Sequence, residues 1–505
     1  MATQELSLPL SARLIINGEE PGASGGRHFA RENPADTDQT VTLAEEGTID
    51  DVRAAIDAAR RAFDSDTQSW VSDYKLRERV LYRVGQLMRA NAERLSKVVS
   101  LEVGMPMRQA VAHIGAAADV FEFYAGYCSK LYGEAMVLAN GSVINLLKEP
   151  VGVVGVITPW NFPLTQTARK VAPALAVGCT LVVKPASYTP ASTYELVRLL
   201  HEAGLPPGVV NCVSGPGRIV GNELVESPKI DKVSFTGETE TGKNILQRAA
   251  VDLKRVSLEL GGKNPFVMFA GADMEAAAQS LVFAMYRNAG QACGSTSRLL
   301  VQEDIHGPFL ERVTALTTSL RVGDPASTET DMGPMISKSQ EETVLGYVEY
   351  GLDAGFRLVT GGNKMKGDGL DKGYFIEPTI FDDVDNSSRL GQEEIFGPVL
   401  AVTPFKDDDE AVRLANDVVY GLTAAVWSGD PAKSLRVARA IQAGTVWIND
   451  AYTQPPEGIW GGYKQSGMGR ELGPYGIDDF VEIKQIYTDG TGLTTKAPYR
   501  QVLRD

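Results

Sequence analysis

The sequence predicts an α/β protein with a doubly wound parallel sheet, a second α/β domain and a small β element. Three observations lead to this prediction. Apolar segments alternate with helical patterns after Pro150, which is typical of parallel strands joined by helices. A looser alternation of the same kind runs over residues 261–446. Before Pro150, short extended stretches flank Asn140-Gly141, a dipeptide favoured in hairpin turns.

The first part of the chain reads as helical. Thr48-Ile-Asp-Asp51 resembles a capping box, with Asp in place of the usual Glu or Gln. The helix that follows has an apolar stripe made of Val52, Ala55, Ile56, Ala59 and Phe63. A second helix is predicted over residues 75–103, where Gly104-Met-Pro106 ends it, and a third continues to about residue 131. Residues 133–149 then form the predicted hairpin.

Five apolar segments form the predicted parallel sheet. They are Val151–Ile157, Leu181–Lys184, Val209–Val213, Lys232–Phe235 and Val256–Leu260. The turn Gly215-Pro-Gly217-Arg-Ile-Val-Gly221 follows the third strand and opens a helix, as a phosphate-binding turn does. Its spacing is one residue longer than the common dinucleotide fingerprint, so a plain strand-to-helix turn is the alternative. Helical patterns over residues 192–203 and 239–250 complete the crossovers.

Composition narrows the class of protein. At 505 residues the chain is long enough for about three structural units. A net charge of −15 argues against nucleic acid or an anionic membrane as the main partner. The first residues lack a signal-peptide layout, and the longest uncharged run, 150–168, contains three prolines, so no membrane helix is expected. These features indicate a cytoplasmic protein.

The four cysteines differ in their surroundings. Cys128, Cys179 and Cys212 lie in apolar patterns and are predicted to be small buried residues. No metal-ligand spacing appears, so no metal is expected. Cys293 follows a Gly-Gln pair in Tyr286-Arg-Asn-Ala-Gly-Gln-Ala-Cys293, a segment without histidine. Because the thiolate is the reactive form of cysteine, a nucleophile here needs another base or a lowered pKa.

Two other motifs supply groups that such a nucleophile needs. Glu259 ends the apolar run Val256-Ser-Leu-Glu259, where an unpaired carboxylate would be costly unless it had a function. Asn161 lies in Pro159-Trp-Asn161-Phe-Pro163, and its amide is a candidate oxyanion donor. The alternatives are an ion pair at the strand end for Glu259 and a cap on the following helix for Asn161.

Cys293, Glu259 and Asn161, with their flanking motifs in this order, resemble the aldehyde dehydrogenase superfamily over nearly the whole chain. The resemblance is to its non-acylating members, because the deacylating acid is present. It implies a Rossmann-like NAD(P)-binding domain over 1–132 and 151–260, and a catalytic domain over 261–446. Residues 133–150 and 482–505 would be oligomerisation segments of a homodimer or homotetramer. Residues 447–481 would return to the cofactor domain and the active-site rim.

The resemblance also implies roles for single residues. Cys293 would attack the aldehyde, Asn161 would hold the oxyanion and Glu259 would activate the hydrolytic water. NAD or NADP would lie against segments at the ends of the predicted strands and on Glu394-Ile-Phe396. The cofactor-binding residues expected there are Ile157, Pro159, Trp160, Lys184, Ser187, Gly217, Gly221, Phe235, Gly237, Glu238, Leu260, Glu394 and Phe396. NADP is expected to be accepted because Ser187 stands where NAD-preferring members often carry Glu. Glu238, where the family often has Ser, is expected to point away from the phosphates.

The resemblance implies an aldehyde substrate, and the sequence gives two opposed indications of its type. Arg169 and Arg287 match positions that bind a carboxylate in succinic semialdehyde dehydrogenases. The tail, from Gly444 to Gly467, is similar to betaine-aldehyde-type enzymes. A cation at position 169 would repel a quaternary ammonium, so a semialdehyde or other anionic aldehyde is expected.

Phe162 and Trp460 are the other predicted substrate contacts. Three alternatives remain open. The arginines could have a surface or ion-pair role, the substrate could be a neutral aliphatic or aromatic aldehyde, and the chain could be a non-catalytic relative.

Overall fold

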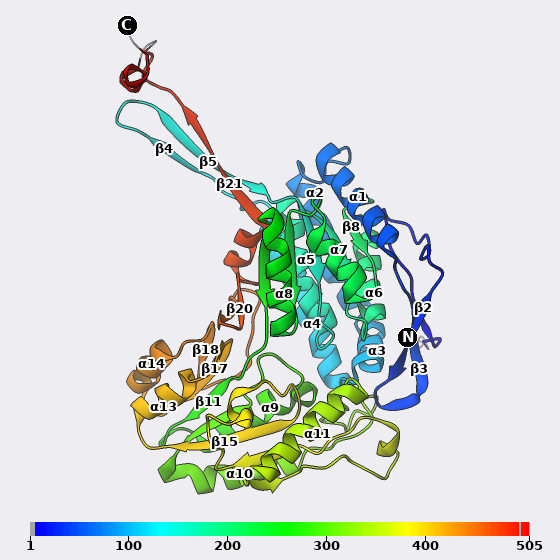
Figure 1. Ribbon diagram of the computed structural model, residues 1–505, viewed down its shortest axis with the longest axis vertical. Helices are drawn as coiled ribbons and strands as arrows, with labels where there is room; N and C mark the ends of the chain where they lie inside the picture. Colours follow the sequence, from blue (N-terminus) through cyan, green and yellow to red (C-terminus); the bar gives the residue numbers. More distant parts are fainter. Residues whose placement is uncertain (1–5, 494–495, 504–505) are drawn as a thin grey trace.

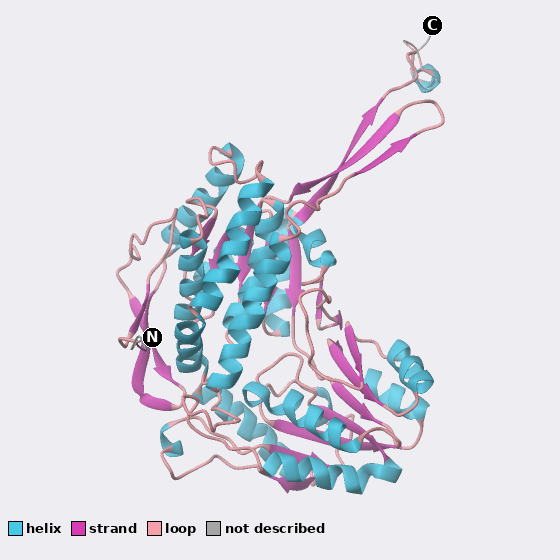
Figure 2. Cartoon of the chain, turned by 180° about the vertical axis from the view of Figure 1, so that it is seen from behind, coloured by secondary structure: helices cyan, strands magenta, loops and turns pink. Residues whose placement is uncertain are grey.

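The computed structural model describes residues 6–493 and 496–503, so the ends of the predicted 1–132 and 482–505 segments partly lie outside the described residues. Two α/β bodies are stacked along the long axis of the molecule, and a narrow β arm projects from the upper one (Figure 1). The same arm is seen from behind in Figure 2. Within the described residues, we find no helix with the length and apolar character needed to span a bilayer.

The upper body is built on a six-stranded sheet in the order β20-β10-β9-β6-β7-β8. All neighbours are parallel except β20, which pairs antiparallel with β10. The strands are β6 (Val153–Ile157), β7 (Thr180–Lys184), β8 (Val210–Cys212), β9 (Lys232–Thr236), β10 (Arg255–Glu259) and β20 (Gly467–Met468). The five parallel strands confirm the segments predicted from the sequence. The strand β20 comes from the late segment of the chain and closes the sheet edge.

The order of these strands fixes where a ligand can bind. The chain enters at β6, continues outward to β7 and β8, and then returns to β9 on the other side of β6. The crossovers after β6 and β9 therefore leave in opposite directions, which opens a crevice at the carboxyl ends of these two strands. The turns after Ile157 and Thr236 border this crevice, and Glu259 at the end of β10 is next to it.

Helices cover both faces of this sheet (Figure 1). On one face, α1 contacts β7 and β8 and packs against α7, which contacts α8. On the other face, α5 and α6 contact the strands, and α2, α3 and α4 pack outside them. Their bounds are α1 (Ile49–Ser65), α2 (Tyr74–Ala90), α3 (Ala92–Val103), α4 (Met107–Ala125), α5 (Pro163–Val177), α6 (Pro190–Glu202), α7 (Asn222–Glu226) and α8 (Thr239–Ala249).

Two details of the predicted helices differ in the structure. The helix predicted over 75–103 is two helices, because Asn91 leaves helical geometry at φ −104° and ψ 14° and its side chain donates to the Leu87 carbonyl. Local bonding by Asn competes with the helix ladder in this way. The third helix ends at Ala125, earlier than the predicted limit near residue 131. The capping box at Thr48 and Asp51 is confirmed, with both reciprocal hydrogen bonds present.

The lower body contains a seven-stranded sheet in the order β13-β14-β15-β12-β11-β17-β18. Only β13 runs antiparallel to its neighbour. The strands are β11 (Pro265–Met268), β12 (Arg298–Gln302), β13 (Arg357–Thr360), β14 (Thr379–Asp382), β15 (Val399–Phe405), β17 (Thr423–Trp427) and β18 (Thr445–Ile448). The last strand extends just beyond residue 446, where the catalytic domain is expected to end.

Each face of this second sheet has its own apolar core. Side chains from α9 (Met274–Tyr286), α10 (His306–Thr318) and α11 (Lys338–Asp353) form one core with the sheet. Side chains from α13 (Asp408–Asn416) and α14 (Pro431–Ala440) form the other. Three short elements complete this part of the chain: α12 (Arg389–Gln392), and the pair β16 (Tyr420–Gly421) and β19 (Tyr463–Lys464).

Two small sheets flank the upper body. The first is β1 (Leu10–Ala12), β2 (His28–Asn33) and β3 (Asp36–Glu45). The second is the projecting arm, in which β5 (Val143–Pro150) pairs antiparallel with both β4 (Glu134–Val137) and β21 (Val481–Thr488). The hairpin predicted around Asn140-Gly141 is therefore confirmed. The arm carries exposed apolar side chains, including Met136, Val137 and Ile483.

The start of β12 is held by a fully buried arginine. Arg298 donates to the carbonyls of Lys263, Leu414 and Ala415 and to the side-chain oxygen of Asn386. Burial lowers the pKa of this guanidinium to about 10. Four acceptors from three separate segments therefore depend on one side chain.

We expect Arg298→Met to destabilise the protein by about 3 kcal/mol or more, because each buried acceptor left unpaired costs roughly 1–3 kcal/mol. The thermal unfolding midpoint, followed by circular dichroism, should fall by several degrees. Arg312→Met is the control, since Arg312 is exposed and pairs only with Glu275. Equal midpoints for the two variants would show that the Arg298 network does not stabilise the fold.

Candidate active site

The loop that carries Cys293 has an unusual backbone. Asn288 and Ala289 adopt positive φ angles of 51° and 55°, and Gly290 follows at 72°. Residues other than glycine rarely adopt positive φ angles, so contacts with other residues must hold this backbone conformation. The side chain of Gln291 does so by donating to the Asn288 carbonyl at 3.0 Å and accepting from the Ile336 amide at 2.8 Å. The nucleophile loop is therefore fixed from both sides.

Asn161 is tied to this loop by two hydrogen bonds in opposite directions. Its side-chain Nδ2 donates to the Gln291 carbonyl at 3.0 Å. Its own carbonyl accepts from Asn288 Nδ2 at 3.0 Å. Asn161 does not cap α5, so that alternative is wrong: the Leu164 amide in the first turn donates to His113 instead. The side-chain amide of Asn161 thus contacts the loop at Gln291, two residues before Cys293.

Cys293 is partly exposed at a cavity of about 810 Å³. Burial, together with the charge of Glu394, raises the pKa of its thiol to about 12. The thiol is therefore protonated at neutral pH and needs a proton acceptor before it can attack. The other three cysteines are fully buried, as predicted, and their thiols also have raised pKa values because of burial.

Glu259 lies at the end of β10 and is buried, with one carboxylate oxygen, Oε2, unpaired. Burial and the neighbouring Glu471 raise the pKa of Glu259 well above its usual value. Glu471 itself forms a buried ion pair with Lys170. Within the described residues Glu259 has no ion-pair partner, so the alternative of an ion pair at the strand end finds no support there. No local sequence motif marks the pair of Glu471 and Lys170, and sequence reasoning missed it.

The predicted cofactor residues gather around the crevice at the switch point. Ile157 ends β6, and Pro159 and Trp160 follow it; Phe235 lies near the end of β9, and Gly237 and Glu238 follow that strand; Leu260 follows β10. The ring of Phe235 covers Gly237, where an added Cβ would come within 2.5 Å of it. The Glu238 side chain is exposed at the N-terminus of α8. Trp160 contacts Phe396 edge to face, with ring centroids 5.4 Å apart.

Three features of this crevice fit an anionic, hydroxylated ligand. Lys184 at the end of β7 is buried, and within the described residues its ammonium donates only to the neighbouring Pro185 carbonyl, at 3.1 Å. Burial lowers the pKa of Lys184 to about 8. Gly217 begins and Gly221 ends the helical turn after β8, and no atom of the described residues occupies the space beside Gly217. Ser187 is exposed just beyond Lys184.

Glu394 completes the crevice from the lower body. Its carboxylate accepts from the Gly262 amide at 3.0 Å, and burial raises its pKa to about 7. Thr236 and Thr239, on either side of the turn after β9, have buried hydroxyls without a partner in the described residues. Unpaired buried hydroxyls and an acceptor carboxylate are the groups that a ribose and a pyrophosphate would satisfy.

The predicted substrate residues line the same cavity as Cys293. Phe162, Arg169, Arg287 and Trp460 all contribute to its wall. Arg169 is buried, lies 5.4 Å from the Trp460 ring centroid and donates to Gln454. The guanidinium of Arg287 is surrounded by the rings of Phe162, Phe283 and Tyr452, at 5.0, 5.8 and 4.9 Å. Neither arginine is paired with a carboxylate in the described residues.

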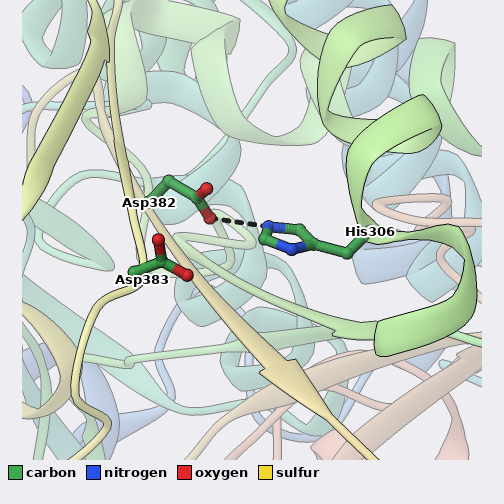
Figure 3. A group of neighbouring side chains, drawn as sticks. All are labelled: His306, Asp382 and Asp383. Atoms are coloured by element: carbon green, nitrogen blue, oxygen red, sulfur yellow. Dashed lines mark hydrogen bonds and ion pairs between the residues drawn. The ribbon is translucent and has the colours of Figure 1, made fainter.

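One group of acidic and histidine side chains lies elsewhere, in the lower body. Among the described residues, His306, Asp382 and Asp383 are close enough together to share a metal ion. Figure 3 shows His306 Nε2 bonded to Asp382 Oδ1, a contact of 2.8 Å. The other oxygen of Asp382 accepts from Arg357, which also lies 3.8 Å from Asp383. The arginine thus lies between both carboxylates and offsets part of their negative charge, and the group joins α10 to the edge of the sheet.

Comparison with known proteins assigns nearly the whole chain to one family. Residues 22–486 match the sequence model described as "Aldehyde dehydrogenase family". Betaine aldehyde dehydrogenase of Bacillus subtilis (strain 168) is 42% identical over 479 residues, covering 95% of this chain and 97% of that protein. The peroxisomal aminoaldehyde dehydrogenase 1 of Pisum sativum is 38% identical, covering 97% of both.

Solved structures agree closely in fold. An NAD-dependent aldehyde dehydrogenase from Sinorhizobium meliloti superposes with a TM-score of 0.94 at 40% identity, covering 97% of both chains. Betaine aldehyde dehydrogenase from Staphylococcus aureus in complex with NAD+ gives a TM-score of 0.93 at 38% identity, again covering 97% of both. With its fold, its motifs in order and these matches together, the chain belongs to the aldehyde dehydrogenase family.

Proposed function

We propose that this protein oxidises an aldehyde to a carboxylic acid with NAD or NADP, through a covalent intermediate on Cys293. The observation that carries the proposal is the position of Cys293: it opens on the 810 Å³ cavity while its loop is tied to Asn161. A structural cysteine would have no reason to face a cavity from a loop held in a strained conformation.

The first half of the reaction uses Cys293 and Asn161. The thiol proton passes to solvent water at the cavity, and the thiolate sulfur forms a bond to the aldehyde carbon while the C=O π bond opens toward oxygen, giving the anion of a thiohemiacetal. The negative charge that develops on oxygen is stabilised by the second N–H of Asn161 Nδ2, because the first donates to the Gln291 carbonyl. The backbone N–H of Cys293 is the second donor in the proposal. A nicotinamide cofactor, when bound, would supply the oxidant for the loss of a hydride from the substrate carbon, which would leave a thioester on Cys293.

The second half uses Glu259. The thioester left on Cys293 is hydrolysed by a water molecule, and a carboxylate with a raised pKa is suited to take the proton of that water. The burial of Glu259 and the nearby charge of Glu471 supply the raised pKa. Because the active form is the carboxylate, hydrolysis should accelerate as the pH rises through that pKa.

The crevice at the switch point is the proposed cofactor site. Lys184 and Ser187 would contact the adenosine ribose, the turn of Gly217 and Gly221 would border the adenosine end, and Glu394 would accept from the hydroxyls of the nicotinamide ribose. Use of NAD is supported by two similar structures, the NAD-dependent aldehyde dehydrogenase from Sinorhizobium meliloti and the Staphylococcus aureus enzyme in complex with NAD+. We propose that NADP is also accepted, because no carboxylate is present at Ser187 to repel a 2′-phosphate.

For the substrate we propose an anionic aldehyde such as a semialdehyde. In the part of the chain that the structure describes, buried Arg169 has no partner for its Nε, and Gln454, on the same cavity, has none for its Nε2. Buried donors without acceptors are costly, so an acceptor on the ligand is expected to satisfy them. The names of several relatives point instead to betaine aldehyde, whose quaternary ammonium two unpaired arginines would repel. A neutral aldehyde is the second candidate, because aromatic rings also line the cavity.

Two variants should separate the two halves of the reaction. Cys293→Ala should lose dehydrogenase activity while still binding the cofactor. Glu259→Gln should give a stoichiometric burst of reduced cofactor, measured by its absorbance, followed by turnover at least about 100-fold slower. Cys128→Ala is the control, because that thiol is buried away from the cavity. Steady turnover near the wild-type rate in Glu259→Gln would exclude Glu259 as the hydrolytic base.

Cofactor preference can be tested at Ser187. Ser187→Glu should shift the ratio of kcat/KM values toward NAD by roughly tenfold, or about 1.4 kcal/mol, through repulsion of the 2′-phosphate. The control is Ser72→Glu, an exposed position near the opposite, amino end of β7. Steady-state kinetics with both cofactors measure the ratio. An unchanged ratio in Ser187→Glu would show that residue 187 does not discriminate between cofactors with and without the 2′-phosphate.

The anionic substrate can be tested at the two arginines. Arg169→Leu or Arg287→Leu should reduce kcat/KM for succinic semialdehyde by an amount that corresponds to about 2–5 kcal/mol of lost transition-state stabilisation. The reduction for butanal should be much smaller, because the chemistry at Cys293 is unaffected. Arg108→Leu is the control: Arg108 also lines the cavity but is exposed and paired with Asp331. If both substrates lose activity equally, or neither does, the arginines are structural and a neutral substrate is favoured.

A further inference from the structure

A buried histidine determines the hydrogen bonding of one side chain in the substrate cavity. His113 on α4 is 1% exposed and lies behind the first turn of α5. Its Nε2 accepts from the Leu164 amide at 3.2 Å, and its Nδ1 contacts Thr165 Oγ1. The histidine therefore replaces a side-chain cap, which the N-cap residue Phe162 does not provide.

These two contacts fix the position of the imidazole proton. A backbone amide can only donate, so Nε2 must carry a lone pair. Burial and the charges of Arg287 and Arg169 lower the pKa of His113 to about 3, so the ring is neutral. A neutral imidazole has one N–H, which must then be on Nδ1. Nδ1–H donates to Thr165 Oγ1, and the threonine oxygen is the acceptor in this contact.

The hydrogen of the Thr165 hydroxyl is therefore available for another acceptor. Thr165 is 7% exposed, and it lines the same cavity as Cys293, Arg169 and Arg287. Within the described residues the only side-chain partner of Oγ1 is His113. Because Thr165 is itself buried, an O–H without an acceptor would carry a desolvation cost.

Other polar atoms without a partner in the described residues belong to side chains of the same wall. Arg169 Nε and Gln454 Nε2 are buried donors of this kind. Both residues line the cavity with Thr165. A carboxylate has four lone-pair positions, so it can accept from the Thr165 hydroxyl and from an arginine at the same time.

We propose that Thr165 donates a hydrogen bond to the anionic end of the aldehyde, and that His113 is the positioning residue that holds its hydroxyl in the donor role. This inference rests on the proposed carboxylated substrate and adds a residue that determines specificity. The selectivity for a carboxylated over an uncharged aldehyde then depends on an uncharged side chain as well as on the two arginines.

The test compares Thr165→Val, which keeps the shape and removes the hydroxyl, with Thr165→Ser, which keeps the hydroxyl. Each is assayed with succinic semialdehyde and with butanal. Thr165→Val should lower kcat/KM for succinic semialdehyde about tenfold or more, mainly through KM, and should lower it for butanal by a clearly smaller factor. Thr165→Ser should retain most of the wild-type ratio. Equal losses for the two aldehydes in Thr165→Val, or the same loss of ratio in Thr165→Ser, would overturn the proposal.

The role of His113 is tested by a double-mutant cycle. His113→Leu should reduce the ratio in the wild-type background and change it little when Thr165 is already Val. An effect of the same size in both backgrounds would show that His113 does not act through Thr165. His113→Gln keeps an acceptor for the Leu164 amide and provides a folded comparison if His113→Leu is unstable, with thermal midpoints measured for all variants.

Assays of the wild-type enzyme distinguish a failure of the proposed substrate from a failure of the proposed role of Thr165 and His113. If it does not prefer succinic semialdehyde over butanal, the anionic substrate of the proposed function is wrong, and the role of Thr165 falls with it. If it has that preference and the arginine variants lose it while Thr165→Val and Thr165→Ser behave alike, only the role of Thr165 and His113 is overturned.

Discussion

The active site depends on a pair of buried hydrogen bonds between two segments that are far apart in the chain. Asn161 follows a strand of the upper sheet, and Asn288 and Gln291 precede a strand of the lower sheet. Asn161 donates to the Gln291 carbonyl and accepts from the Asn288 side chain, both at 3.0 Å. Because the two bonds run in opposite directions, the turn and the loop cannot slide past one another without losing both. The positions of Cys293, Asn161 and the crevice are therefore fixed relative to one another.

Burial, more than any single contact, determines the chemistry of the groups around Cys293. It raises the pKa values of Cys293, Glu259 and Glu394 and lowers those of Lys184 and His113. Burial thereby favours the neutral form of each group, and it brings the pKa values of Glu394 and Lys184 to about 7 and about 8, near neutral pH. Glu471, which pairs with the buried Lys170, lies near Glu259 and raises the pKa of Glu259 further.

The family relationship and the substrate are set by different parts of the structure. The fold is that of the family, and a solved structure at 40% identity shares it. The cavity wall carries the features that bear on the substrate: an arginine inside a ring of three aromatic side chains, a second buried arginine, and a threonine fixed by a histidine. Aromatic rings around a cation stabilise that cation. Here the cation belongs to the protein, so the same rings do not favour a cationic substrate.

The sequence by itself determined the five parallel strands, the hairpin, the capping box at Thr48 and the membership of Cys293, Glu259 and Asn161 in one family pattern. These are local features: apolar periodicity, turn residues and short motifs act over a few positions. It could not show that Asn91 breaks the second helix, because the side-chain bond competes only weakly with the helix ladder. The strand β20 could not be predicted from the sequence either, because a two-residue edge strand has no periodicity.

The tertiary structure alone decided what surrounds each reactive group. Glu471 is 212 positions from Glu259 in the chain, and His113 is 52 from Thr165, so no local pattern links them. Arg169 and Arg287 come together only because the first turns of α5 and the end of α9 border one cavity. Burial, charge coupling and the direction of a hydrogen bond depend on groups brought together by folding. For this reason the motifs predicted the class of chemistry, whereas the arrangement of the cavity wall supports a particular class of aldehyde.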